Sequence, residues 1–335
     1  MKITHIHIER FRGFQNEDFE VGSLLTAIAG QNGTQKSTLL GIITQTFTLK
    51  TEDSMRVEKP LCGGSYISAF KDKFRLSPTF DKPKGHEWTI SFDAGMDDFT
   101  VESIKRTGDP NVRFWKKGAR QEGDGYISFP TIFLSLKRLV PVAEEAKIIT
   151  DDTLLTQEEL NEFKQLHNKI LIAQTPISSA TTITSKNKQS IGVSTELYDW
   201  NQNSMGQDNL GKIILALFSF KRLHDKYPRQ YKGGILAIDE MDATMNPASQ
   251  VELLKVLRKY ASKLNLQILF TTHSMSLLKA MDDLVQEVTK KEETANQAKI
   301  LYLKKVDDKI AIKQGVNFKG IQLDLNVVAE GNNRK

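Results

Sequence analysis

The sequence has 335 residues, of which 39% are hydrophobic and 26% are charged, enough to bury the core of one large α/β domain or of two modest domains. The lone cysteine, Cys62, excludes a disulfide framework and a cysteine-based zinc site, and no apolar run approaches the roughly 20 residues that a membrane span needs. Lys and Arg (46) exceed Asp and Glu (41) by five, which permits partners such as nucleic acid without requiring them. We therefore expect a cytoplasmic protein without a membrane partner.

The first predicted element is a β-hairpin. Residues 3–8 alternate between apolar and polar side chains, and a second β-rich run lies around residues 18–21. His5 and His7 share one face of the first strand and could form half of a metal site. No further pattern of His or Cys ligands follows, so we favour a solvated strand edge.

A polar loop with two glycines follows a third predicted strand. Residues 27–38 have the sequence AIAGQNGTQKST, an apolar run, a loop and the start of a helix. This spacing is typical of a P-loop, whose backbone N–H groups surround a polyphosphate while a lysine contacts the terminal phosphates and a hydroxyl binds Mg²⁺. Lys36 and Ser37 take these last two roles, with Thr38 behind Ser37. The predicted nucleotide contacts are Gly30, Gln31, Asn32, Gly33, Thr34, Gln35, Lys36, Ser37 and Thr38.

One position departs from the P-loop pattern, because the residue before the lysine is usually glycine and here is Gln35. The loop bends tightly at this point, often with a positive φ, and a left-handed conformation costs a non-glycine residue about 1–2 kcal/mol. We expect the glutamine side chain to leave the phosphate cradle, towards solvent or towards a facing subunit. An isolated chain should then bind ATP weakly.

The opening sequence IHIERFRGF, the FEV strand and the loop GQNGTQKST together resemble the head domain of SMC, RecF and related ABC-type ATPases. The resemblance implies an α/β fold of the P-loop NTPase class, with a mostly parallel core sheet, an antiparallel β meander and a short helical insertion. It also implies ATP and Mg²⁺ as ligands.

A second motif of this family lies directly before an amphipathic helix. Residues 203–207, NSMGQ, match the ABC signature LSGGQ in position, keeping Ser204, Gly206 and Gln207 while Asn203 and Met205 replace the leucine and the first glycine. A hydroxyl and backbone N–H groups at a helix N-terminus can bind a phosphate. In this family the signature of one subunit completes the site built on the other subunit's P-loop, so the resemblance implies a head-to-tail dimer.

Four acidic or imidazole positions complete the motif series. The apolar run 233–238 ends in Asp239 and Glu240, a Walker B strand in which Asp239 holds the magnesium shell and Glu240 acts as general base, although a salt bridge at a strand end is the alternative. Asp242 takes the place of the acid in the D-loop that crosses a dimer interface. His273, after the run 266–270, takes the H-loop position, where the imidazole reaches the γ-phosphate. A core histidine is the alternative.

The interval between the P-loop and the signature contains three β-like runs, 87–93, 99–104 and 111–115, which predict an antiparallel meander. Its basic residues could face phosphates beside Phe114 and Trp115, although we favour an ordinary half-solvated sheet. They are Lys105, Arg106, Arg113, Lys116, Lys117 and Arg120.

Three further segments precede the signature. A buried strand at 130–135 ends beside Lys137 and Arg138, which could touch nucleotide or a partner or could equally be surface charges. Residues 156–173 predict a capped amphipathic helix, and 175–194 predict an exposed loop. In SMC-type proteins a long coiled coil occupies this interval, which is too short for one here. The helix should therefore serve packing or the docking of a partner.

We expect one ABC-type ATPase domain over 1–335. Its parts are a hairpin and P-loop at 1–50, an antiparallel β subdomain at 51–150, a helical and loop insertion at 151–200, a lobe with the later motifs at 201–281, and a C-terminal hairpin at 282–335. The tail is too short for the nuclease domain of OLD-type proteins and has no D-x-D cluster, so an effector would be a separate chain.

The ordered motifs predict an ATP-hydrolysing enzyme with Lys36, Glu240 and His273 as catalytic residues and a homodimer or higher oligomer around the nucleotide. Compact ATPases of this group act in bacterial anti-phage and abortive-infection systems beside a nuclease or toxin, so a nucleotide-gated defence ATPase is the first hypothesis. A RecF-like DNA-binding ATPase of repair or recombination is the second. A scaffold that binds nucleotide with little turnover is the third. Fold alone does not decide among them.

Overall fold

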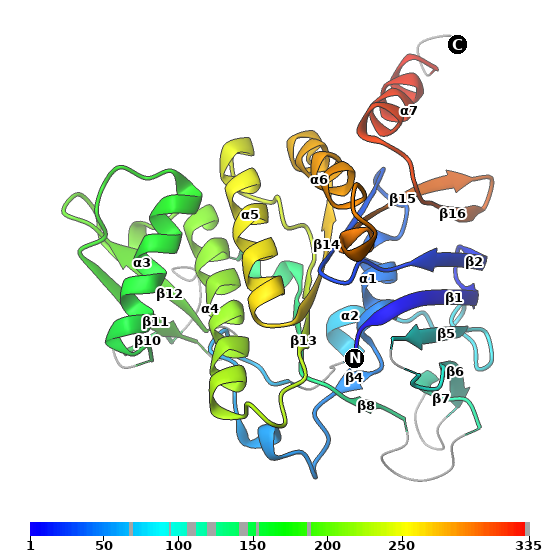
Figure 1. Ribbon diagram of the computed structural model, residues 1–335, viewed down its shortest axis with the longest axis horizontal. Helices are drawn as coiled ribbons and strands as arrows, with labels where there is room; N and C mark the ends of the chain where they lie inside the picture. The colour runs from blue at the N-terminus through cyan, green and yellow to red at the C-terminus, as the bar shows by residue number, and fades with distance from the viewer. Residues whose placement is uncertain are drawn as a thin grey trace.

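A six-stranded sheet forms the centre of the molecule (Figure 1). The computed structural model describes residues 1–66, 70–93, 95–105, 112–118, 125–140, 147–151, 154–185 and 189–331. Every residue of β3, β13 and β14 is buried, as expected for parallel strands covered on both faces. The strand order is β16 (Lys309–Lys313), β15 (Ala298–Val306), β3 (Leu25–Gly30), β14 (Leu266–Thr272), β13 (Gly234–Ile238) and β9 (Thr131–Leu134), with only β16 antiparallel.

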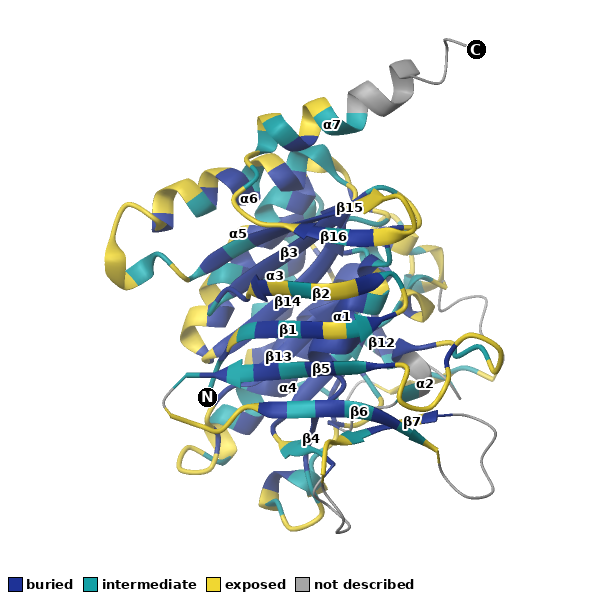
Figure 2. Ribbon diagram, turned by 90° about the vertical axis from the view of Figure 1, so that its right-hand side faces the viewer, coloured by how far each residue is buried: buried dark blue, intermediate teal, exposed yellow. Residues whose placement is uncertain are grey.

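The helix after the P-loop, α1 (Lys36–Thr44), lies between this sheet and a second, antiparallel sheet of five strands. Burial alternates along β5 and β6 of the second sheet, since one face covers α1 and the other meets solvent (Figure 2). The predicted hairpin and meander are both confirmed, and β1 joins them by pairing with β5. The order is β2 (Phe14–Glu20), β1 (Ile3–Phe11), β5 (Glu87–Phe92), β6 (Phe99–Lys105) and β7 (Val112–Lys116).

Long helices cover the other face of the core sheet (Figure 1). They are α4 (Met205–Lys226), α5 (Pro247–Lys263) and α6 (Met275–Val288), and α3 (Gln157–Leu171) packs outside them. The predicted capping box of α3 is present, and its Glu159 pairs with Arg222 of α4 at 2.6 Å. This helix therefore serves packing within the chain. Smaller elements are β4 (Phe47–Thr48), β8 (Ile127–Ser128), α2 (Phe70–Lys73) and 3-10 turns at Ser54–Val57, Leu136–Leu139, Trp200–Gln202 and Glu292–Thr294.

The exposed loop predicted at 175–194 is wrong. The segment contains β11 (Ser179–Thr184) and β12 (Gln189–Ser194), which form a three-stranded antiparallel sheet with β10 (Ile149–Asp151). Ile191 and Val193 of β12 are buried in the core beside α4. The Ser- and Thr-rich composition suggested a loop, but β-branched threonine favours strands when apolar residues recur at every second position.

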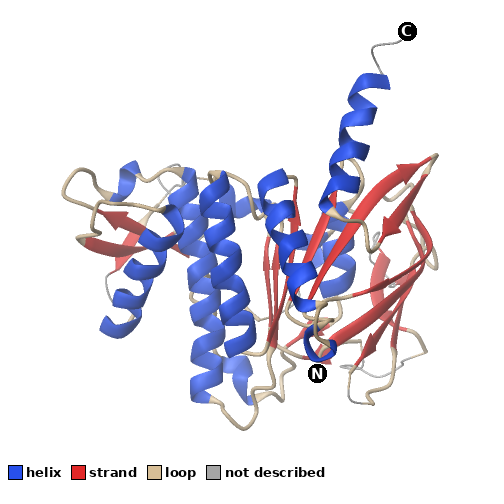
Figure 3. Ribbon diagram, turned by 45° about the horizontal axis from the view of Figure 1, so that its top comes forward, coloured by secondary structure: helices blue, strands red, loops and turns tan. Residues whose placement is uncertain are grey.

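The C-terminal segment contains the predicted hairpin and an additional helix. β15 pairs with β16 as predicted and also with β3, so the hairpin extends the core sheet. After it, α7 (Phe318–Gly331) projects from the body, anchored by buried Ile321 (Figure 3). The helix was not predicted. None of the helices in the described ranges is both long and apolar enough to cross a membrane.

Candidate nucleotide site

Three predicted motifs meet at one edge of the core sheet. The strands β3, β14, β13 and β9 run parallel, so Gly30, Thr272, Ile238 and Leu134 all lie at carboxyl ends of neighbouring strands. Open α/β sheets bind their ligands at this edge. The P-loop, the Walker B acids and the H-loop histidine are therefore neighbours although more than 200 positions separate the first from the second.

The P-loop has the backbone shape that its glycines predict. Gly30 has a φ of +152°, and a Cβ atom added to it would lie 2.5 Å from the carbonyl oxygen of Leu303. Gly33 has a φ of +81°, and the hydroxyl of Thr34 donates to the Gln31 carbonyl at 2.8 Å. Within the described part of the chain, no side chain caps the N-terminus of α1. Its first N–H groups can therefore bind an anion.

Lys36 lies inside this loop. Its ammonium group donates to the carbonyl oxygens of Gly30 at 3.1 Å and Gln31 at 2.9 Å, and the residue is 7% exposed. Burial lowers the pKa of Lys36, and the carboxylates of Glu240 and Asp239 act in the opposite direction. Both hydrogen-bond partners are neutral, so the ammonium can exchange them for a more strongly attracting phosphate.

Asp239 lies 5% exposed at the end of β13, and a single carboxylate oxygen accepts two hydroxyls. Ser37 Oγ and Thr271 Oγ1 each donate to Asp239 Oδ1 at 2.8 Å. Among the described residues, no group of three or more His, Cys, Asp or Glu side chains could hold a metal ion. A hydroxyl and one carboxylate instead suit Mg²⁺, which keeps most of its water and takes further oxygens from a nucleotide.

Glu240 has a backbone that two neighbouring side chains hold in an unusual conformation. Its φ is +49°, its N–H donates to Thr271 Oγ1 at 2.6 Å, and its carbonyl accepts from Arg138 Nη2 at 2.8 Å. A left-handed non-glycine residue costs energy that such contacts must offset. Thr271 thus orients both acids. Sequence reasoning did not assign it a role, although it stands two positions before the H-loop histidine.

The D-loop and the H-loop contact each other. The backbone N–H of His273 donates to Asp242 Oδ2 at 3.4 Å, and Gln250 Nε2 donates to the Asp242 carbonyl at 3.2 Å. Burial lowers the pKa of His273 and Lys36 lowers it further, against the pull of Asp242 and the other acids. The imidazole is therefore neutral at pH 7 and can hydrogen-bond a ligand without adding charge.

The signature turn stands apart from these groups. Ser204 caps α4: its Oγ accepts from the Gln207 N–H at 3.3 Å, and Gln207 Oε1 accepts from the Ser204 N–H at 2.9 Å. Gly206 is buried, and a Cβ atom there would lie 2.5 Å from the Thr244 carbonyl oxygen. Ser204 itself is exposed. Over the described ranges, no hydrogen bond connects this turn with the P-loop of the same chain.

A family comparison agrees with these motifs. Residues 5–326 match the family model described as AAA domain. The chain belongs to this AAA domain family. Among curated proteins, none matches the sequence.

Solved structures similar to this AAA domain are SMC heads. The SMC head domain from Thermotoga maritima is 14% identical, with a TM-score of 0.51 over 94% of this chain and 100% of that one. An SMC head bound to the C-winged helix domain of ScpA is 14% identical (TM-score 0.55, 96% and 100% covered). A head with an extended coiled coil, bound to the C-terminal domain of ScpA derived from Pyrococcus furiosus, is 13% identical (0.50, 98% and 99%). The predicted fold, the ABC-type ATPase head of the P-loop NTPases, is confirmed.

Gln35 of the AAA domain has the strained backbone that was predicted, with φ 63° and ψ 31°. The predicted direction of its side chain, towards solvent or a facing subunit, is wrong. Its Nε2 lies 2.7 Å from where a Cβ atom on Gly13 would stand, so the amide packs against the β1–β2 turn of its own chain. Gly13 leaves the space that the glutamine fills. Gln35 Oε1 is buried there, and none of the described residues forms a hydrogen bond with it.

The predicted basic residues are largely engaged within the AAA domain. Lys117 pairs with Glu87 at 2.5 Å, and the Lys116 ammonium lies over the Phe99 ring. Lys105 is exposed, Arg113 has an intramolecular contact, and Arg106 and Arg120 lie outside the described residues. These contacts favour the half-solvated sheet over a phosphate-binding face. Among the other candidates, His5 and His7 each contact Asp18 at 3.1 Å, Lys137 is exposed and Arg138 is buried.

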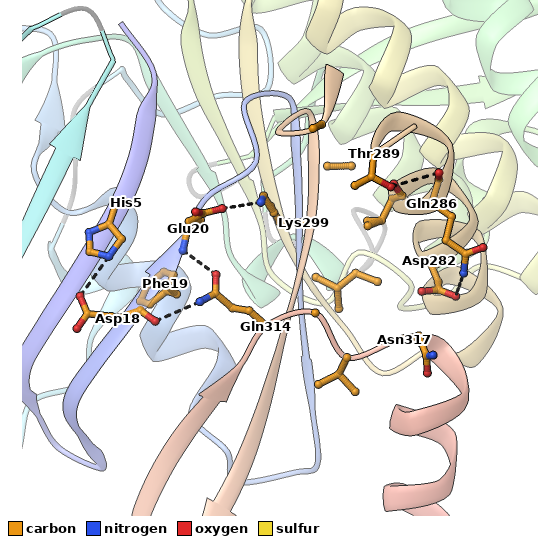
Figure 4. A pocket seen from close by; sticks show the side chains of 16 residues that line it. His5, Asp18, Phe19, Glu20, Asp282, Gln286, Thr289, Lys299, Gln314 and Asn317 are labelled. Carbon is orange, nitrogen blue, oxygen red and sulfur yellow. Dashed lines mark hydrogen bonds and ion pairs between the residues drawn. The ribbon is translucent and has the colours of Figure 1, made fainter. Parts of the chain in front are cut away.

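A pocket of 810 Å³ lies at the other end of the core sheet (Figure 4). Its walls come from β2, α6, β15 and the segment before α7. Lys299 pairs with Glu20 at 2.5 Å, and Gln314 Nε2 donates to the Asp18 carbonyl at 3.2 Å. Ala298, at the amino end of β15, lines the pocket. The P-loop follows the carboxyl end of β3, which runs parallel to β15, so the two sites lie at opposite ends of the strands. It is therefore separate from the nucleotide site.

Proposed function

We propose that this AAA domain binds Mg²⁺ and ATP at residues 30–38 and hydrolyses ATP between two copies of the chain. The observation that carries the proposal is the 2.8 Å hydrogen bond from Ser37 Oγ to Asp239 Oδ1. It joins the P-loop hydroxyl to the Walker B carboxylate beside Lys36, which is the oxygen set that Mg²⁺ and a triphosphate require.

Each group then has a defined role. The amides of the loop and the start of α1 bind the phosphates, and Lys36 neutralises the terminal charge. When bound, Mg²⁺ neutralises the phosphate oxygens while Ser37 and Asp239 hold its shell. Glu240 orients the attacking water and accepts its proton, and the neutral imidazole of His273 hydrogen-bonds the γ-phosphate. Thr271 keeps both acids in place through its single hydroxyl.

The second copy supplies the signature. Ser204 is exposed at the N-terminus of the 22-residue helix α4, beside the exposed apolar side chain of Met205. A helix N-terminus with free N–H groups and a hydroxyl stabilises a phosphate, but here it contacts no P-loop group of its own chain. In a head-to-tail dimer each signature turn would face the nucleotide held by the partner. Asp242 would lie at the same interface.

The experiment uses Glu240→Gln, which keeps the shape of the acid but removes the base. A general base contributes about 100- to 10,000-fold to turnover, so this variant should hold ATP without hydrolysing it. Sedimentation velocity should show a dimer with ATP and Mg²⁺ and a monomer with ADP. The control is Glu292→Gln, which changes an exposed residue away from the nucleotide site. It should hydrolyse ATP like wild type.

Two results would contradict the proposal. Unchanged ATP turnover in Glu240→Gln would show that Glu240 is not the general base. A monomer at saturating ATP would show that the nucleotide site is not shared between two copies. Rapid binding with no turnover in wild type would instead favour the nucleotide-stabilised scaffold.

The biological role proposed for this cycle is the gating of a separate effector, a nuclease or toxin, in bacterial anti-phage defence. It rests on the family resemblance and on the two SMC heads whose structures contain a domain of ScpA, a separate partner. Co-expression with the product of a neighbouring gene, followed by co-purification with and without ATP, tests it. An effector whose toxicity is the same with wild type and Glu240→Gln would contradict gating.

A further inference from the structure

Arg138 is a charged side chain in the interior that the roles above do not use. It is 2% exposed and follows β9 at the same edge as the P-loop. Its Nε donates to Asn209 Oδ1 at 2.7 Å, its Nη1 to the carbonyls of Leu134 and Ser135 at 3.2 and 3.1 Å, and its Nη2 to the Glu240 carbonyl at 2.8 Å. All four acceptors are neutral oxygens. The planar guanidinium therefore donates hydrogen bonds to three separate segments: α4, the end of β9 and the turn at Glu240. The single ammonium of a lysine cannot reach all three.

The elements that Arg138 joins belong to different motifs. Asn209 lies in the second turn of α4, five positions after the signature serine, and is completely buried. Its Nδ2 donates to the Ala243 carbonyl at 3.0 Å, in the D-loop. Together with the close approach of Gly206 to Thr244, these contacts bind the signature helix to residues 239–244 as one unit.

Arg138 remains charged within this unit. Burial lowers its pKa to about 10, while Asp239, Glu240 and Asp242 act in the opposite direction. A buried charge is tolerated where hydrogen bonds satisfy it, and removing its partners is costly. The contacts are therefore mutually dependent: the arginine stabilises the turn at Glu240, and the turn keeps the arginine in the interior.

We propose that Arg138 is a positioning residue that couples the two nucleotide sites of the dimer, by locking the signature turn of a chain to the Walker B acids of the same chain. The inference rests on the proposed function, in which these two parts serve different nucleotides. Closure of the signature turn on the partner's ATP then fixes Glu240 against the chain's own ATP. Turnover should be cooperative, and the cooperativity should pass through Arg138 and Asn209.

The test measures ATP turnover against ATP concentration for wild type, Arg138→Lys, Arg138→Met and Asn209→Ala. Wild type should give a Hill coefficient clearly above 1, up to the limit of about 2 for two sites. The variants should approach about 1 and lose about tenfold or more in kcat, while ATP affinity of the dilute chain stays within about twofold. Lys137→Met removes the neighbouring exposed charge and is the control. The double variant Arg138→Lys with Asn209→Ala should be no worse than the poorer single variant.

Thermal unfolding identifies variants that fail to fold. Arg138→Lys keeps the charge, and Asn209→Ala leaves the arginine in place, so each remains informative if Arg138→Met unfolds. A wild-type Hill coefficient of 1, or an unchanged coefficient in either folded variant, would overturn the coupling. Failure of the proposed function has a different signature, the lack of ATP-dependent dimers and turnover in wild type itself.

Discussion

The turn at Asp239 and the turn at Ser204 differ in what holds them. Asp239 is buried and accepts hydroxyls from α1 and β14, elements far from it in the sequence. Ser204 is exposed, and its hydrogen bonds reach only three positions along the same helix. The first turn is fixed by the tertiary fold, whereas Ser204 is held by a local cap, although Gly206 in the same turn packs against the D-loop. A chain that fixes one half of a phosphate site internally and exposes the other half is suited to share that site with a second copy.

Among the three changes that test this comparison, Ser204→Arg should break the exposed half and cause the largest effect. The arginine places bulk and positive charge where the partner's nucleotide would approach, while the helix cap is at the surface, so the monomer should stay folded. Turnover should fall by about 100- to 1,000-fold, the usual loss when a transition-state hydrogen bond disappears. ATP binding by the dilute chain should be unchanged.

Sedimentation with ATP is the measurement, and Ser262→Arg, an exposed serine on α5, is the matched control. Unchanged assembly and turnover in Ser204→Arg would assign the interface to another surface.

Lys36→Ala should break the internal half, with the opposite pattern. Charged hydrogen bonds contribute about 1.5–3 kcal/mol, so ATP affinity of the dilute chain should fall about 10- to 100-fold. At a given subsaturating ATP concentration fewer dimers should then form than in wild type, because less ATP is bound. Calorimetric titration with ATP is the measurement, and Lys59→Ala, at an exposed lysine, is the control. A loss of ATP affinity distinguishes Lys36→Ala from Ser204→Arg. Equal affinity in Lys36→Ala and wild type would contradict the P-loop assignment.

The same contrast explains what the sequence could predict. Gly30, Lys36 and Ser37 lie within eight positions. Their residue types and spacing predict a phosphate-binding loop without any contact to a distant segment. Asp239 and His273 follow apolar strands, so their place at one sheet edge follows from parallel pairing. The hairpins and the meander were accessible because each depends on periodicity within one segment. The parallel core was implied by the resemblance to ABC-type ATPase heads.

Features that depend on contacts between distant segments were not accessible. The sequence left Arg138 open between a surface charge and a contact with nucleotide or a partner. Only the packing of α4 against the 3-10 turn Leu136–Leu139 shows that it is buried. Thr271 has no sequence signal beyond its position near His273. Strand β12 is buried against α4 and β11 pairs with it, which the Ser- and Thr-rich composition did not reveal.

Gln35 belongs to the internal half but is strained, and it should have the smallest effect. A left-handed glutamine costs about 1–2 kcal/mol, so part of the unliganded population should hold the loop in another conformation. ATP must then bind the left-handed form alone. The apparent affinity for ATP is therefore reduced in proportion to the fraction of chains that hold the loop in this form. The unpartnered Gln35 Oε1 adds nothing that offsets this cost. The strain therefore weakens ATP binding by a single chain.

Gln35→Gly removes the strain and should tighten ATP binding by the dilute chain by up to about tenfold, since 1.4 kcal/mol corresponds to one decade. Gln35→Ala is the matched control, because it removes the amide beside Gly13 but keeps the Cβ atom that opposes the φ of 63°. Alanine should therefore leave affinity near that of wild type. Calorimetric titration of the three proteins decides the matter. If glycine binds ATP no more tightly than glutamine, the loop accommodates Gln35 without strain, and the weak binding expected of a single chain must come from the missing signature alone.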